Sequence, residues 1–259
     1  MHSQMQHRIL ETLAEIEQQE NVRVLFACES GSRAWGFPSA NSDFDVRFIY
    51  VRSQADYLRL NEPRDVIERP IVDDLDINGW DLRKTLKLML KSNPTLMEWL
   101  GSPIVYREEP AIASKIRQIA PDFYNPTAAH SHYFSMAKTH MRSLQADEVS
   151  IKKYFYALRP MLAMFWIEAN RGPVPTEFQT MLEQLPLEAS LVAEVNRLME
   201  LKKSGDELGR GPRIAILSEF LEKELAHRQE NPIVLTKTAP DMEKLNRLFL
   251  EILGEIWAT

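Results

Sequence analysis

The chain has 259 residues, of which 44% are hydrophobic and 26% charged, and its formal net charge is −6. This composition excludes wholesale disorder, and the length allows one large domain or two smaller ones, each with its own core. A single cysteine excludes an internal disulfide framework and a cysteine-based zinc site. No apolar run approaches a membrane span and the start lacks a signal pattern, so we expect a cytoplasmic protein without a membrane partner.

Helical spacing of apolar residues predicts a helix over residues 9–18. Residues 22–28 are apolar and β-branched, which is typical of a buried strand, and they lead into a sharp turn over residues 29–36. That turn contains two of the nine glycines of the chain. Alternation of apolar and polar residues predicts a second strand over residues 42–51, and we expect a third extended segment over residues 71–80.

From residue 82 onward the apolar spacing becomes helical, and Pro94 after Asn93 is well placed to begin a helix. Beyond about residue 110 prolines divide an almost wholly helical pattern into helices of ordinary length. Strands followed by helices in separate runs favour the α+β class. We therefore expect an α/β domain over residues 1–108 and a helical domain over residues 109–259.

The first strand ends at Gly31 and Ser32, and ten residues later the second strand opens with Asp43 and Asp45. Alternate residues of a strand project to one side, so both carboxylates point to the same place. Two converging carboxylates repel each other unless a cation lies between them, and oxygen ligands suit Mg²⁺. A Gly-Ser turn supplies backbone N–H groups and a hydroxyl, which can bind phosphate oxygens.

A third carboxylate from a neighbouring strand would complete a two-metal site. Asp76 is the favoured residue and Asp74 the alternative, in a short segment that several aspartates share. Such a site activates an attacking hydroxyl and stabilises the leaving oxygen of an in-line phosphoryl displacement.

The Gly31–Ser32 and Asp43–Asp45 spacing resembles the signature of the polymerase-β nucleotidyltransferase superfamily. The continuous run from Gly31 to Tyr50 resembles, more narrowly, the predicted nucleotidyltransferases of the RNA-repair-associated DNA polymerase β family. The similarity extends from about Leu25 to about Phe178 and includes residues 76–84, 91–106 and 152–160.

This resemblance implies a polymerase-β-like nucleotidyltransferase domain, with a mixed sheet and flanking helices, followed by an all-helical domain. It implies that Asp43, Asp45 and Asp76 are the catalytic metal ligands for two Mg²⁺ ions, which Mn²⁺ can replace. It also implies that Gly31 and Ser32 hold the β- and γ-phosphates of a nucleoside triphosphate.

The helical part offers a second group of candidate residues. On a helix over residues 151–170, Lys152, Tyr156 and Arg159 share one narrow face, and the opposite face is apolar. Residues 126–171 carry six Lys or Arg and three Asp or Glu, a local charge of +3. With the resemblance, this face is a nucleotide-binding surface; without it, the face is the solvated side of an amphipathic helix. Lys153 and Arg33 complete the nucleotide-binding candidates.

Other chemistry-bearing residues have simpler interpretations. Arg33 and Arg47 either reach the site or neutralise its acids. His130 and His132 do not face one ion, because positions i and i+2 of a helix point apart. Cys28 suits the core of an apolar strand, and Trp35, beside the phosphate turn, either packs or stacks on a base.

The expected activity is therefore an enzymatic one of the EC 2.7.7 type. A nucleoside monophosphate passes from a nucleoside triphosphate to an acceptor hydroxyl and pyrophosphate leaves, with RNA repair or RNA-end modification as the setting. The alternatives are a protein or small-molecule acceptor on the same fold, and a non-catalytic nucleotide-binding interaction module.

Overall fold

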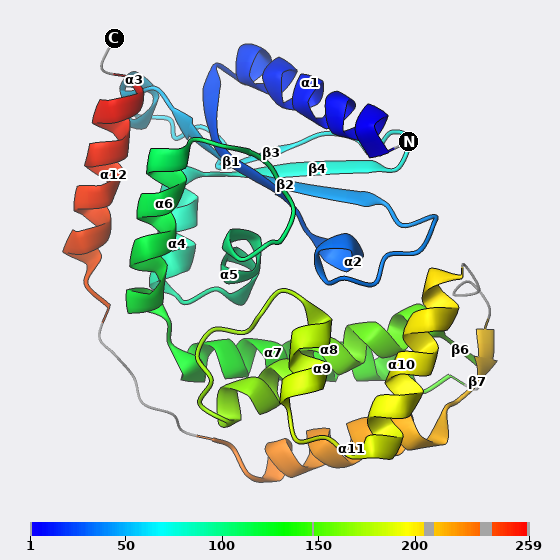
Figure 1. Ribbon diagram of the computed structural model, residues 1–259. Coiled ribbons are helices and arrows are strands. Elements are labelled where there is room, and N and C mark those ends of the chain that lie inside the picture. The colour runs from blue at the N-terminus through cyan, green and yellow to red at the C-terminus, as the bar shows by residue number, and fades with distance from the viewer. Residues whose placement is uncertain (1, 147, 205–209, 234–239, 258–259) are drawn as a thin grey trace. The chain divides into compact units, whose positions relative to one another are not determined.

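The computed structural model describes residues 2–146, 148–204, 210–233 and 240–257. The chain divides into two compact units, each assembled from segments that are separated along the sequence (Figure 1). Unit 1 comprises Met1–Ala34, Asp43–Phe123 and Ala239–Thr259, and unit 2 comprises Trp35–Ser42 and Tyr124–Thr238.

Unit 1 is built on a five-stranded mixed sheet, with the strand order β3-β4-β2-β1-β5. The central strand β2 pairs antiparallel with β1 and parallel with β4, and the outer strands β3 and β5 are antiparallel to their neighbours. The predicted α+β class with a mixed sheet is confirmed. The strands are β1 (Val22–Glu29), β2 (Phe44–Arg52), β3 (Val66–Glu68), β4 (Leu75–Asp81) and β5 (Val105–Glu108).

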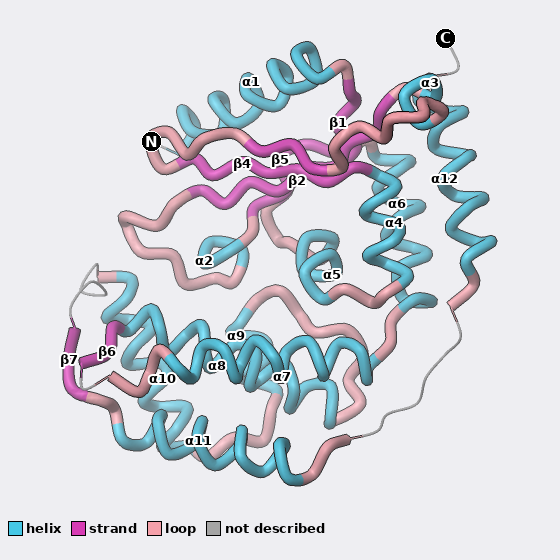
Figure 2. The backbone as a smooth tube through the Cα atoms, turned by 180° about the vertical axis from the view of Figure 1, so that it is seen from behind, coloured by secondary structure: helices cyan, strands magenta, loops and turns pink. Residues whose placement is uncertain are grey.

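Helices cover both faces of this sheet (Figures 1 and 2). On one face α1 (His2–Glu20) buries Ile9 and Leu13 in the same apolar cluster as Phe48 of β2. On the other face the next residue of β2, Ile49, joins a second apolar cluster, because successive strand residues point to opposite faces. That second cluster includes side chains of α4 (Leu82–Leu90), α5 (Pro94–Leu100), α6 (Pro110–Ile119) and α12 (Met242–Ile256).

Local signals account for the ends of several of these elements. The side chain of Asn93 accepts a hydrogen bond from the amide of Leu96 at 3.1 Å, and Pro94 occupies the first turn of α5, as the sequence predicts. The third strand begins at Leu75 rather than at residue 71, because Asp73 and Asp74 adopt positive φ angles of 46° and 61° in a turn. Short helices α2 (Gly31–Ala34) and α3 (Gln54–Tyr57) follow β1 and β2, and the 3₁₀ helix η1 (Ala120–Phe123) follows α6.

Unit 2 is mainly helical and is centred on α8 (Ile151–Glu168), which is buried along most of its length. Unit 2 also contains a two-stranded sheet of β6 and β7, whereas the sequence predicts an all-helical domain. These strands could not be predicted, because three residues are too few to show a period. Within the described ranges, no helix combines the length and apolarity that crossing a bilayer requires. The other elements are α7 (Pro126–Arg142), β6 (Glu148–Ser150), α9 (Phe178–Gln184), α10 (Ala189–Lys203), β7 (Arg210–Pro212) and α11 (Ala215–Glu230).

The observed division differs from the expected boundary between residues 108 and 109. Helix α6 lies beyond that boundary, yet its side chains Ile112 and Ile116 are buried in the core of unit 1. Helix α12 returns to the same core with Leu245 and Ile252. The units differ from the expected domains because apolar side chains from segments that are distant along the chain are buried in one core.

Candidate active site

The carboxylates of Asp45 and Asp76 lie opposite each other on neighbouring strands. Asp45 of β2 pairs with Asp76 of β4 in the parallel register, so both side chains project to the same face of the sheet. Their side chains are 30% and 31% exposed. Asp74, the alternative third carboxylate, lies in the turn before β4, where its carbonyl accepts a hydrogen bond from the amide of Phe44 at 2.7 Å.

Asp43 precedes β2 by one residue and is exposed. Its main-chain carbonyl accepts a hydrogen bond from Nε of Arg33 at 3.1 Å, and the Arg33 guanidinium lies 3.7 Å from the centre of the Phe44 ring. The predicted residues Arg33 and Asp43 are thus brought side by side, although ten positions separate them in the sequence.

The turn at Gly31 lies directly against Asp45. Gly31 has a φ of +58°, and a Cβ atom placed on it would lie 2.0 Å from Oδ2 of Asp45. The amide of Ser30 donates a hydrogen bond to the main-chain carbonyl of Asp45 at 2.8 Å. Ser32 follows in α2 and is partly buried. Only glycine allows the turn to approach the carboxylate this closely.

Arg47 joins the two opposed carboxylates. Its Nη2 donates to Oδ1 of Asp45 at 3.1 Å and to Oδ2 of Asp76 at 2.7 Å. The sequence leaves open whether Arg47 reaches the site or neutralises its acids, and in the structure it pairs with two of those acids, Asp45 and Asp76. The shared guanidinium offsets the repulsion that two facing carboxylates would otherwise experience.

Glu29 is a fourth carboxylate that the sequence analysis missed. It ends β1, it is buried, and its Oε1 accepts a hydrogen bond from the amide of Asp45 at 2.8 Å while Oε2 accepts one from the hydroxyl of Tyr106. Burial raises the pKa of Glu29 to about 7. The available signal was an acidic residue that directly follows the apolar run of residues 24–28.

This raised pKa predicts a specific pH dependence of stability. Because folded Glu29 binds its proton more tightly than the unfolded chain, folding stability falls as pH rises from the ordinary carboxyl pKa towards 7. Glutamine does not titrate, so Glu29→Gln lacks this pH dependence. The free energy of unfolding of the variant minus that of wild type is therefore expected to increase by on the order of 3 kcal/mol from pH 5 to pH 8. Urea unfolding of both proteins at the two pH values measures the difference. Parallel pH profiles would contradict the prediction.

The four candidate nucleotide-binding residues of α8 do not form one exposed cationic face in the structure. Lys152 is exposed, and Lys153 donates a hydrogen bond to the carbonyl of Ser143 at 3.3 Å. The ring of Tyr156 is stacked on that of His140, with centroids 5.4 Å apart. Arg159, however, is only 1% exposed, because unit 2 surrounds α8 on this side as well.

The buried Arg159 contacts the segment Trp35–Ser42, which connects the two halves of the Gly-Ser and Asp-x-Asp motif. Its guanidinium lies 4.6 Å from the centre of the Trp35 ring. The carbonyl of Trp35 accepts a hydrogen bond from the amide of Phe178 at 3.0 Å, and the buried Phe37 ring stacks on Phe155 at 4.6 Å. Trp35 is therefore a packing residue of unit 2, while both neighbours of the segment, Ala34 and Asp43, belong to unit 1.

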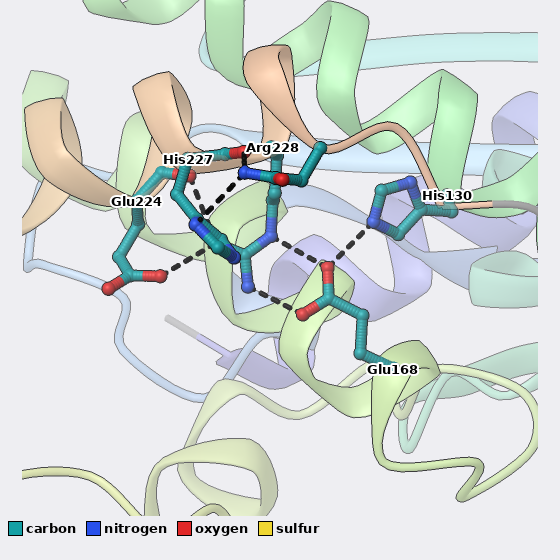
Figure 3. A network of polar contacts seen from close by, with 6 residues as sticks. His130, Glu168, Glu224, His227 and Arg228 are labelled. Atoms are coloured by element: carbon teal, nitrogen blue, oxygen red, sulfur yellow. Dashed lines mark hydrogen bonds and ion pairs between the residues drawn. The ribbon is translucent and has the colours of Figure 1, made fainter.

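An ion-pair network links α7, α8 and α11 inside unit 2 (Figure 3). Arg228 donates hydrogen bonds to both carboxylate oxygens of Glu168, at 2.7 and 2.6 Å, and a further one to Glu224 at 2.8 Å. His130 lies 2.8 Å from Glu168 through its Nε2. His130 thus has an acidic partner on the following helix, 38 residues later in the chain, which its local sequence did not reveal.

A divalent metal ion is implied by the motif, and its fit rests on the donor atoms. Across the described ranges, no group of three or more His, Cys, Asp and Glu side chains is arranged so that it could hold a metal ion, and Arg47 pairs with both Asp45 and Asp76. These two aspartates nevertheless provide hard oxygen donors, and both already contact one positive group, the Arg47 guanidinium. The Gly31 turn adjoins Asp45. This donor chemistry fits Mg²⁺ or Mn²⁺.

The chain resembles known proteins over nearly its whole length. Residues 5–251 match the family described as the RNA repair pathway DNA polymerase beta family. The chain is 46% identical over 255 residues to YcgL of Bacillus subtilis (strain 168), described as an uncharacterized protein, and the match covers 98% of each. A nucleotidyltransferase-like protein from Exiguobacterium sibiricum 255-15 aligns with a TM-score of 0.35 and 13% identity over 98% of this chain and 91% of that one.

Proposed function

The chain belongs to the RNA repair pathway DNA polymerase beta family, and from this premise we propose that it is an enzyme of the EC 2.7.7 type that acts in the cytoplasm. It transfers a nucleoside monophosphate from a nucleoside triphosphate to an acceptor hydroxyl, with release of pyrophosphate. The observation that carries the proposal is the pairing of Asp45 with Asp76 beside the Gly31 turn.

In this proposal Asp43, Asp45 and Asp76 hold two Mg²⁺ ions, for which Mn²⁺ can substitute. Magnesium bound there would neutralise phosphate charge and lower the pKa of the attacking hydroxyl. The residues of the chain bind and orient the substrates. Gly31 and Ser32 bind the β- and γ-phosphates through main-chain N–H groups and the serine hydroxyl.

Further nucleotide-binding roles are proposed for Arg33 and, on unit 2, for Lys152, Lys153 and Tyr156. Arg33 is supported by its hydrogen bond to the carbonyl of Asp43. Lys152 is supported by its exposure, which leaves an ammonium group accessible to phosphate. For Arg159 we propose an indirect role in nucleotide binding, because its guanidinium packs on Trp35 at the start of the segment Trp35–Ser42.

The proposed acceptor is an RNA end, as the family description suggests. The test uses the full chain with Mg²⁺, nucleoside triphosphates labelled at the α-phosphate, and RNA oligonucleotides. Label is then followed into the RNA, protein and small-molecule fractions. Label in the protein or small-molecule fraction would replace the acceptor, and the absence of Mg²⁺-dependent triphosphate binding by calorimetry would overturn the enzymatic proposal.

The carboxylates are tested by substitution. Replacing Asp43 or Asp45 by Ala, or Asp76 by Asn, is expected to lower label transfer by roughly 10²-fold or more, because several kcal/mol of transition-state stabilisation depend on them. Asp74→Asn is the matched control: it lies two residues from Asp76, in the turn outside the strand pair, and asparagine tolerates its positive φ. Transfer by the Asp43 and Asp45 variants at the wild-type rate would show that these residues are misassigned.

A further inference from the structure

We infer that Arg47 is a positioning residue that orients Asp45 and Asp76 for binding a divalent cation. The inference rests on the proposed function, because it assigns a role within the same site. The evidence is that the Arg47 guanidinium donates hydrogen bonds to four acceptors and that the Arg47 side chain is 17% exposed.

Two of these acceptors are main-chain carbonyls. Nη1 of Arg47 donates to the carbonyl of Val46 at 3.0 Å and to that of Asp76 at 3.1 Å. Val46 lies on β2 and Asp76 on β4, and the parallel ladder between these strands fixes both carbonyls. The guanidinium is therefore held by the backbone of the sheet, independently of the two carboxylates.

The other two acceptors determine how the carboxylates are turned. Nη2 binds Oδ1 of Asp45 and Oδ2 of Asp76, so the second oxygen of each carboxylate lies outside this bridge. For Asp45 that second oxygen, Oδ2, is the atom that faces Gly31. The bridge thus presents the Asp45 carboxylate to the turn that is proposed to bind phosphate. Hydrogen-bonding partners of ligating carboxylates act in this way in metal sites.

A different role makes the opposite prediction. If Arg47 only took the place of a metal ion and had to leave before metal binding, its removal would free the carboxylates and tighten metal binding. Simple electrostatics also predicts tighter metal binding when Arg47 is removed, because the loss of a positive charge favours binding of a cation nearby. A loss of metal affinity on removing Arg47 therefore distinguishes positioning from both alternatives.

The experiment measures Mn²⁺ binding to the full chain by calorimetry. We expect Arg47→Gln and Arg47→Lys to bind Mn²⁺ roughly 10- to 100-fold more weakly than wild type, the usual effect of losing a partner of a metal ligand. Lysine keeps the charge but cannot contact two carboxylates and two carbonyls at once, so it does not rescue binding. Arg64→Gln is the matched control: it removes one charge from an exposed pair with Glu68 and is expected to bind as wild type does.

Equal or tighter binding by folded Arg47→Gln overturns the inference and leaves the proposed function standing. Wild type that binds no Mn²⁺ overturns both. Circular dichroism melting curves establish that each variant is folded, and Arg47→Lys carries the test if Arg47→Gln is not. A double-mutant cycle with Asp76→Asn adds a metal-free measurement. The melting temperature is expected to fall less on removing Arg47 when Asp76 is already neutral, and equal falls in both backgrounds also overturn the inference.

Discussion

Replacing Gly31 by Ala is expected to lower nucleotidyl transfer by roughly 10²-fold, the effect of misplacing a reacting group by about 1 Å. A Cβ at residue 31 would lie 2.0 Å from Oδ2 and 2.9 Å from Cγ of Asp45. The whole carboxylate would have to turn away, and this rotation would break its bond to Arg47. Because Asp45 can rotate, we expect the proposed metal binding and transfer activity to be affected more than folding.

The control for Gly31 is Gly36, five residues further on. Gly36 also has a positive φ, of +90°, but a Cβ placed there has no atom within 4 Å. Gly36→Ala therefore carries the backbone strain, about 1–2 kcal/mol, without displacing a carboxylate. Label transfer and Mn²⁺ affinity are measured for both variants. If Gly36→Ala loses as much activity as Gly31→Ala, strain in the turn and not the approach to Asp45 is the cause.

Replacing Glu168 by Ala is expected to lower the free energy of unfolding by about 3 kcal/mol, since it strips partners from a buried cation. The Arg228 side chain is 3% exposed and makes two of its charged hydrogen bonds to Glu168. Urea unfolding followed by circular dichroism measures the change. The control is Glu200→Ala, which breaks an exposed pair with Lys203 and should cost less than about 0.5 kcal/mol.

The effect of Glu168 also depends on pH. Burial alone would raise the pKa of Glu168, but hydrogen bonds from His130 and Arg228 outweigh it and lower the pKa below its ordinary value. The stabilisation from this carboxylate is therefore present above the ordinary pKa and is lost as pH falls through the lowered one. Wild type and Glu168→Ala should converge in stability at acidic pH. A constant difference down to pH 3 would contradict this assignment.

The sequence predicts part of the arrangement around the carboxylates, namely a strand that carries Asp45 and a neighbouring one that carries Asp76. A period of two places Asp43, Asp45 and Arg47 on one side of the predicted strand. Asp74 and Asp76 are themselves two residues apart, so the preference for Asp76 also needs the resemblance to the family's motif. The structure pairs Asp45 with Asp76 and leaves Asp74 in the preceding turn. Local periodicity was informative because the register of a strand is fixed once one of its faces is buried.

The environment of α8 could not be predicted in the same way. Helical period identifies which residues share a face, but not whether a second element covers that face. Arg159 shares a face with Lys152 and Tyr156, yet it is buried. One residue that packs on it is Trp35, which lies more than a hundred residues earlier in the chain and so has no signal in the helical period. Glu29 escaped notice for a related reason, because its partners Tyr106 and Asp45 lie on two other strands.

The position of α12 has a consequence for how the protein is made. The ribosome completes every element of unit 2 before it synthesises α12, yet Leu245, Leu248 and Ile252 of this helix are buried in the core of unit 1. The nascent sheet, with its opposed aspartates, must therefore wait with part of its apolar core uncovered until α12 has been synthesised. During that interval the growing chain exposes apolar surface of the kind that favours aggregation and chaperone binding.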